Sequence, residues 1–516
     1  MASTFHGIEV SKRGLFAQQT ALNTTGHNIS NANTEGYTRQ RANMQATTGI
    51  PYVSLQSSTE AGILGTGVQV TDLQRLRDSF IDVQYRAENK DYGYWEAKAS
   101  GLTQIEAIMN EPSDTGLQSV MDQFWQSWED LSNDPASLSS RVVVRERAIA
   151  VADTLAANVD SLTQLQTDLD DKVATDAMQI NSIATQIADL NTQISKLVPT
   201  GYEPNDLYDQ RDVLIDKLSK MVTTTVTQTD NGMVNVMIDG QALVTGRQKS
   251  DFTAVKNATT GFYDLTLGGQ AFTPLSGSLL GTMEARGIAQ PDPTTGNMVV
   301  TGDIPAMLQR LDALATNMAK EINDLHRTGL SLNDIQNRAA DPTAALQDLP
   351  FFVDRTAATA DPSTKTYPTN AKNLMVNPAI MNSLNTIAAA QADSAGQAVE
   401  GDNQNALDIA ALKFKTLSIT VGTSGQPEST TLDDFYRYTI AQLGVDSQEA
   451  QRMEENTELL VQQIETQRQS VSGVSIDEEM ANMIQFQHAY SASARVMTSM
   501  DEILDKMING MGRVGL

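Results

Sequence analysis

Residues 155–197 read LAANVDSLTQLQTDLDDKVATDAMQINSIATQIADLNTQISKL, and their apolar residues alternate at spacings of four and three. The row runs from Leu155 to Leu197, and only Gln166 and Asp176 interrupt it. Such a seam is typical of a coiled-coil-like helix, here roughly 60 Å long at about 1.5 Å per residue. A proline and a glycine follow within four residues and are expected to end the helix.

Two further seams have the same spacing. One runs from Ile304 to Leu325 and the other from Ala450 to Val474. Three narrow seams in one chain most simply pack on one another as an elongated bundle. The alternative is three unrelated amphipathic helices, each on a core of its own.

Between the first two seams the pattern changes to that of short strands. Residues 221–275 contain runs such as VTTTVTQ and MVNVMI, separated by Asp-Asn-Gly, Asp-Gly and Gly-Gly. These hairpin signals predict a β-rich domain inserted at 221–281. Residues 331–400 are richer in Pro, Asp, Thr and Ala and have weak periodicity, which indicates a second, loop-rich outer insertion.

The composition excludes several classes of partner and chemistry. The 516 residues include 36 basic and 63 acidic side chains, a formal net charge of −27. This balance argues against nucleic acid and anionic membranes as partners, because both attract clustered Lys and Arg. The chain has no cysteine, so disulfides, thiolate metal sites and a Cys nucleophile are excluded. Without a signal-peptide pattern or a run of about 18 apolar residues, we expect no membrane insertion and no cleaved signal peptide.

Both ends of the chain carry apolar rows that are too narrow and isolated to form stable helices unaided. A step of two residues within 472–475 breaks the phase between the third seam and the C-terminal row, which indicates a joint between two helical segments. Residues 1–41 are more basic than acidic, and residues 476–516 are the reverse, so a pairing of the first and last helices is favoured. The alternative is that each end docks on the core of its own monomer.

Several motifs resemble those of bacterial flagellar rod, hook and hook-associated proteins. Leu22-Asn23, then NIS at 28–30 and NTEGY at 33–37, resembles their shared N-terminal signature. The continuation YTRQ at 37–40 and the stretch NDLYDQRD at 205–212 are similar to one branch, hook-associated protein 1 or FlgK. Three more segments agree with that branch: LSNDP at 131–135, GDN at 401–403 and SGVSIDEE at 472–479. No specific resemblance covers residues 331–370.

The resemblance implies a structural role outside the cell, in the bacterial flagellum. Proteins of this family form a short helical layer at the hook–filament junction, with their termini in the inner tube. They leave the cell unfolded through the flagellar type III export apparatus. The implied partners are other copies of the chain, the hook protein, the second hook-associated junction protein, the export apparatus and a chaperone of the FlgN type. No cofactor, metal or catalytic residue is implied.

The terminal rows and the signature together give the predicted assembly interface. Its N-terminal part comprises Ile8, Leu15, Leu22, Asn23, Asn28, Ile29, Asn31, Asn33, Gly36 and Tyr37. Its C-terminal part, which by the resemblance also binds the chaperone, comprises Ile476, Met480, Met483, Tyr490, Met497, Leu504 and Ile508.

The expected architecture is mainly α, an elongated α-helical bundle with coiled-coil-like terminal helices and an inserted β-rich domain. The terminal polymerisation domain takes residues 1–35 plus 476–516. The long-helix bundle takes 36–220 plus 282–330 plus 401–475. The β-rich insertion takes 221–281 and the loop-rich outer insertion 331–400.

Three other function classes fit parts of the sequence. An enzyme is disfavoured because the four histidines are far apart and no G-x-S-x-G, P-loop or G-x-G-x-x-G motif occurs. Another flagellar axial subunit, such as the hook protein, the second junction protein or flagellin, shares the terminal pattern but does not explain the stretch at 205–212. A secreted coiled-coil adhesin explains the seams but not the Asn-rich N-terminal motif.

Overall fold

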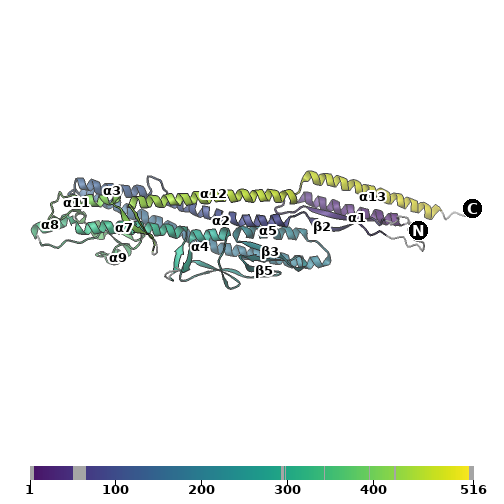
Figure 1. Ribbon diagram of the computed structural model, residues 1–516, viewed down its shortest axis with the longest axis horizontal. Helices are drawn as coiled ribbons and strands as arrows, with labels where there is room; N and C mark the ends of the chain where they lie inside the picture. The colour runs from purple at the N-terminus through teal and green to yellow at the C-terminus, as the bar shows by residue number, and fades with distance from the viewer. Residues whose placement is uncertain are drawn as a thin grey trace, which may run out of the picture.

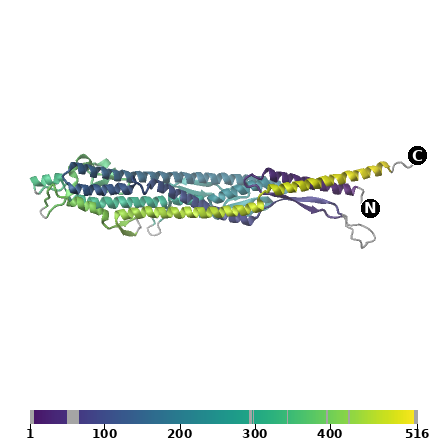
Figure 2. The same cartoon turned by 90° about the horizontal axis from the view of Figure 1, so that it is seen from above.

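The molecule is an elongated rod of long helices, as both views show (Figure 1, Figure 2). The computed structural model describes residues 5–49, 65–291, 296, 298–341, 343–393, 396–422 and 426–510. Helices α1 (His6–Ser30) and α13 (Ile476–Gly510) extend from one end, and α8 (Leu332–Ala340) and α11 (Gln404–Ala411) lie at the other. The mainly α, elongated architecture predicted from the sequence is confirmed. Among the described residues, no helix is both long and apolar enough to cross a membrane.

The longest element is α4 (Leu138–Leu197), a helix of 60 residues that contains the whole first seam. Every apolar seam position from Leu155 to Ile194 is buried, and Leu197 is half-buried. The polar interruptions have partners: Gln166 Nε2 donates to the carbonyl of Arg286 at 2.7 Å. The short 3₁₀ turn η1 (Val198–Thr200), which contains the proline, follows the helix. This seam is therefore the helix that the four–three spacing predicts.

The other two seams form α7 (Asp303–Thr328) and α12 (Leu432–Ser472), but the three do not all meet. Helix α4 contacts α7 and α3 (Leu117–Asn133), whereas α12 packs chiefly along α2 (Ser79–Met109). All three seams nevertheless contribute to one hydrophobic core, as the bundle prediction expects, and α7 contacts both α4 and α12. Within the third seam Ala450 and Ile464 are buried, whereas Leu460 and Val471 are 45% and 43% exposed.

The strands predicted between the first two seams form two small antiparallel sheets. The first contains β3 (Thr224–Gln228), β4 (Val234–Ile238), β5 (Gln241–Thr245) and β6 (Gln248–Lys249) in chain order. The second contains β7 (Phe252–Lys256), β8 (Tyr263–Leu267) and β9 (Gln270–Phe272). Their buried side chains share one core with α4, α5 (Asn205–Met221) and α6 (Gly277–Arg286). Helix α6 spans the boundary expected at residue 281.

Shorter elements complete the part of the chain that the structure describes, apart from the hairpin of β1 (Gln40–Ala46) and β2 (Val68–Arg75). Four two-stranded ladders pair β10 (Ile288–Pro291) with β11 (Met298–Thr301), β12 (Leu330–Ser331) with β15 (Ala388–Ala390), β13 (Phe352–Asp354) with β14 (Leu374–Val376), and β16 (Leu417–Thr420) with β17 (Pro427–Thr430). The remaining short helices are η2 (Asp230–Gly232), α9 (Arg355–Ala360), α10 (Pro378–Asn382), η3 (Leu384–Thr386) and η4 (Leu412–Phe414).

The end of the rod opposite the termini has an aromatic core. Phe124 and Trp128 of α3 pack against Phe351 and Phe352, with ring centroids of Trp128 and Phe351 5.4 Å apart. Residues 331–400 therefore contribute to the main hydrophobic core, although their elements are short. His326 of α7 lies beside Phe351 in an edge-to-face contact.

His326 is held neutral by its surroundings, and we predict that it makes the fold acid-sensitive. Its Nδ1 donates to the Leu349 carbonyl at 2.7 Å, and its Nε2 accepts from the Ala388 amide at 3.0 Å. Burial lowers the pKa of His326 to about 4. The unfolded chain takes up this proton near the ordinary histidine value of about 6.5. Stability is therefore full above that value and falls as the pH drops towards the folded value, by about 3 kcal/mol.

The measurement is denaturant unfolding at neutral and at mildly acidic pH, for the wild-type chain and for His326→Gln. The variant should be less stable at neutral pH but should lose less stability on acidification. The exposed His488 provides the control, since His488→Gln should behave as wild type. Equal acid sensitivity of wild type and His326→Gln would contradict the prediction.

Candidate assembly interface

Helices α1 and α13 lie side by side, and α1 meets α13 with small residues (Figure 1). A Cβ placed on Gly7 would lie 3.0 Å from Met500 Cε, and one on Gly14 would lie 3.2 Å from Ser493 Oγ. The other small or polar residues buried along α1 are Ser11, Ala17, Ala21, Thr24, Thr25 and Asn28. Small side chains let the two backbones approach closely. The pairing of the first and last helices is present, with glycines of α1 facing Met500 and Ser493 of α13.

The predicted apolar row of α1 lies about a third of a turn from this contact face. The four residues of the apolar row are half-buried, and each comes one position after a residue of the contact face. They are Ile8, Leu15, Leu22 and Ile29, which follow Gly7, Gly14, Ala21 and Asn28. The hairpin of β1 (Gln40–Ala46) and β2 (Val68–Arg75) covers part of α1. Of the other predicted residues, Asn28 is buried, Asn31 and Tyr37 are half-buried, and Asn23, Asn33 and Gly36 are exposed.

The residues of the predicted row of α13 differ in exposure. Ile476, Met480, Tyr490 and Ile508 are exposed, Met483 and Met497 are half-buried, and Leu504 is buried. We define the outer row as Ile476, Met480 and Ile484, which are spaced by four and are 48%, 51% and 56% exposed. These three side chains form a solvent-exposed apolar row at the start of α13.

Asn28 explains why asparagine is used at the end of α1. Its Oδ1 accepts from the Tyr37 hydroxyl at 2.8 Å and from the Gln40 amide at 3.0 Å. Its Nδ2 donates to the Gln40 carbonyl at 2.8 Å and to Glu479 Oε2 at 3.0 Å. The amide is thus fully satisfied while buried, and it ties α1 to β1 and α13. Gly36 completes the turn with φ +76°, where a Cβ would lie 2.0 Å from Val213 Cγ2.

The stretch 205–212 begins α5 and holds the turn after α1 onto the rod. Asp209 Oδ2 accepts from the Thr38 amide at 2.9 Å, and Asp206 Oδ1 accepts from Gln40 Nε2 at 2.9 Å. Asp209 and Asp212 both pair with Arg75 Nη1, at 2.9 and 3.0 Å. Burial opposes ionisation of Asp212, but the guanidinium groups of Arg77, Arg75 and Arg86 outweigh it and lower the pKa of Asp212.

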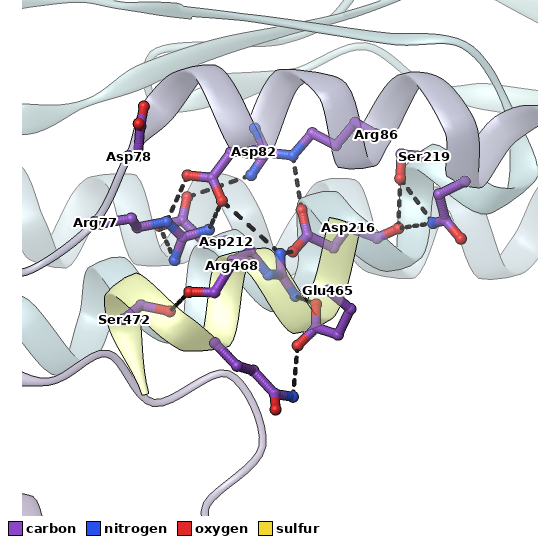
Figure 3. A network of polar contacts seen from close by, with 12 residues as sticks. Arg77, Asp78, Asp82, Arg86, Asp212, Asp216, Ser219, Glu465, Arg468 and Ser472 are labelled. Carbon is purple, nitrogen blue, oxygen red and sulfur yellow. Dashed lines mark hydrogen bonds and ion pairs between the residues drawn. The ribbon is translucent and has the colours of Figure 1, made fainter. Parts of the chain in front are cut away.

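An ionic network continues from this stretch across α2, α5 and α12 (Figure 3). Arg77 Nε pairs with Asp82 at 2.6 Å, and Arg77 Nη1 lies 3.1 Å from Asp212. Asp216 receives Arg86 at 2.7 Å and Arg468 at 2.6 Å. The network therefore joins α2, α5 and α12 near the end of the rod from which α1 and α13 extend.

The connector between α12 and α13 is fixed to the same place. The Arg39 amide donates to the Ser472 carbonyl at 2.9 Å, and the Arg39 side chain pairs with Glu479 at 2.7 Å and Glu478 at 2.8 Å. The helix break predicted within 472–475 is present, since α12 ends at Ser472 and α13 begins at Ile476. We refer to the turn after α1, the first two turns of α5 and this connector as the joint.

Sequence reasoning identified the stretch 205–212 but gave it no role. The available signal is the spacing of its acids: Asp206, Asp209, Asp212 and Asp216 follow one another by three or four residues and so share a face of the helix. Their partners were not predictable, because the arginines that meet them lie more than 100 residues away along the chain.

Comparison with known proteins matches these parts of the chain in turn. Residues 8–38 match the model "Flagella basal body rod protein", residues 102–339 match "Flagellar hook-associated protein FlgK helical domain", and residues 465–510 match "Flagellar basal body rod FlgEFG protein C-terminal". Flagellar hook-associated protein 1 of Bacillus subtilis is 38% identical, over 99% of both chains. The chain belongs to this family, FlgK.

Other relatives agree. Flagellar hook-associated protein 1 of Escherichia coli is 28% identical, over 97% of this chain and 99% of that protein. The structure of the flagellar hook junction protein FlgK from Burkholderia pseudomallei has the same fold, with a TM-score of 0.57 at 16% identity, over 76% of this chain and all of that one. The predicted function, a structural subunit of the bacterial flagellum at the hook–filament junction, is confirmed by this family membership.

Proposed function

We propose that this FlgK family member builds the hook–filament junction by burying the outer row of α13, together with the predicted residues of α1, against neighbouring copies. One observation carries the proposal: Ile476, Met480 and Ile484 are about half exposed at the start of a helix that also contacts α1. A contiguous apolar row on a long helix is costly in water and is typical of a surface that another chain covers.

The remaining predicted interface residues extend this surface along both helices. Tyr490 and Ile508 are also exposed on α13, and Leu15 and Leu22 are half-buried on α1. Burying the part of each side chain that is still exposed can contribute on the order of 1 kcal/mol. Assembly through them couples the ordering of the terminal helices to the joining of subunits.

The partners and the route follow from the same proposal. The chain contacts its own copies in one layer, the hook protein on one side and the second hook-associated junction protein on the other. Before assembly it is exported by the flagellar type III apparatus without a cleaved signal peptide, and a chaperone of the FlgN type covers the apolar row of α13. A chain without cysteine forms no wrong disulfide on emerging from the cell. The role is mechanical and requires no catalysis or cofactor.

We also propose the domain division expected from the sequence. Residues 1–35 plus 476–516 form the polymerisation domain, of which 1–4 and 511–516 lie outside the described residues. Residues 36–220, 282–330 and 401–475 form the rod that spaces the subunits. Residues 221–281 and 331–400 are the outward-facing parts. The joint separates the first of these units from the second.

The test is electron microscopy of purified protein added to isolated hooks that lack filaments. The full chain should add one short layer at the hook tip, and a chain that ends at residue 475 should add none. The absence of a layer, or growth into an unlimited filament, would contradict a junction role.

A further inference from the structure

His27 connects the last turn of α1 to the joint. Its Nδ1 lies 2.9 Å from the Tyr37 hydroxyl, and its Nε2 lies 3.5 Å from Asp206 Oδ2 of α5. The side chains of His27 and Asp206 are 42% and 56% exposed, so both are open to solvent. They line a cleft of about 590 Å³ between the turn after α1 and helices α4 and α5.

The direction of the hydrogen bonds at this site is fixed by backbone groups. The Gln40 amide donates to Asn28 Oδ1, and the Gln40 carbonyl accepts from Asn28 Nδ2, so the orientation of the Asn28 amide is determined. Asn28 Oδ1 can only accept, and therefore the hydroxyl hydrogen of Tyr37 points to it. The Tyr37 oxygen is left to accept from His27. It follows that His27 Nδ1 carries a hydrogen.

This assignment determines what Nε2 presents to Asp206. A neutral imidazole has one N–H, and in His27 that hydrogen is on Nδ1. Nε2 then turns a lone pair towards a carboxylate oxygen, and two acceptors face each other. A second proton on the ring converts this contact into an ion pair while the bond to Tyr37 is kept. The arrangement therefore suits the doubly protonated ring.

The carboxylates around His27 are only partly paired with basic side chains. Among the described residues, Asp206 and Asp189 of the cleft have no basic partner within ion-pair distance apart from His27 itself. The other charges that face the site from the turn, the β1–β2 hairpin, α5 and α13 are paired with one another: Glu35 with Lys217, Asp209 with Arg75, and Glu479 with Arg39. The net charge left beside the ring is negative.

We propose that His27 is a proton-operated clip, which fastens α1 to α5 when the ring carries its second proton and loosens that contact when the proton leaves. The consequence for assembly rests on the proposed function, because neighbouring subunits meet correctly only if the terminal pair keeps its place on the rod. The clip itself is a property of the single chain.

The test is amide hydrogen exchange of residues 25–40 in the purified, unassembled chain, at about pH 6 and about pH 8, with each rate corrected for its intrinsic pH dependence. We expect up to about fivefold higher protection at the lower pH, the size of a partly exposed ion pair. His27→Gln should abolish the difference, and Asp206→Asn should remove the higher protection at the lower pH, because its Nδ2 is a donor that cannot accept from the protonated ring. Asp206→Asn is conservative, since its Oδ1 still accepts from Gln40 Nε2.

The matched control is His488→Gln, which should keep the pH dependence of the wild-type chain. Equal protection at both pH values in the wild-type chain, whether strong or absent, would overturn the proposal. A pH dependence that survives in His27→Gln would also overturn it. Because the measurement uses unassembled chain, failure of the clip and failure of the hook-tip layer are separate results.

Discussion

Replacing the outer row with glutamine, as the triple variant of Ile476, Met480 and Ile484, should abolish the layer at hook tips and leave the single chain folded. Each side chain is about half exposed, so burying its exposed half on assembly stabilises the layer by about 1 kcal/mol. Three such losses in each subunit weaken subunit addition about 100-fold. Glutamine is a good helix former, so helix α13 is preserved.

The measurement combines electron microscopy of treated hooks with circular dichroism of the free chain. The control carries Gln485→Ala and Ser499→Ala, two exposed polar positions on another face of the same helix. The control should form the layer. A triple variant that assembles as well as the control would show that the outer row faces solvent in the assembled state too.

Asp212→Ala should give the largest loss of stability at the joint. The Asp212 carboxylate lies 3.0 Å from Arg75, 3.1 Å from Arg77 and 3.7 Å from Arg86, and its side chain is only 16% exposed. Its removal leaves three guanidinium groups close together without this shared acceptor. Breaking such a buried charge cluster on one side costs roughly 3–5 kcal/mol. The loss should be visible as earlier denaturant unfolding and as faster amide exchange in α2 and α5.

Gln210→Ala provides the comparison, because Gln210 is exposed on the same helix and takes no part in the ionic network. It should change stability by less than about 0.5 kcal/mol. If Asp212→Ala unfolds at the same denaturant concentration as Gln210→Ala, the ionic network does not stabilise the joint.

The parts of the fold that sequence predicts well are those whose signal is local. The apolar residues of the row from Leu155 to Ile194 are all buried. A helix in a bundle contacts its neighbours at regular intervals, and this spacing is visible in its own sequence. Helix α2 was not predicted. Its N-terminal half meets α5 and α12 with Asp82, Arg86 and Asn89, and charged residues give no apolar period even where they are buried.

The termini show a second limit of hydrophobic patterns. The face of α1 that meets α13 is marked by Gly7, Gly14 and Ala21, which fit because they are small and not because they are hydrophobic. The larger apolar residues one position later give the hydrophobic pattern, but they lie beside the contact face; they are Ile8, Leu15 and Leu22. They are half-buried in the single chain, so under the proposed function their exposed parts can contact other copies.

For the residues of the joint, sequence analysis identified the motifs but not the contacts between them. The N-terminal signature and the stretch 205–212 were identified by resemblance, yet only the folded chain brings Thr38 to Asp209 and Gln40 to Asp206. Contacts between segments so far apart in sequence depend on the whole topology. The joint therefore joins two motifs that sequence analysis treats as separate.

The central claim is that copies of the chain bury the outer row in the assembled layer. The natural chain has no cysteine, so Met480→Cys introduces a single thiol at the middle of that row. The measurement is the rate at which a small thiol reagent modifies this residue in the free chain and in the layer formed on isolated hooks. The account predicts rapid modification of the free chain and strong protection in the layer. Equal rates in the two states would contradict it.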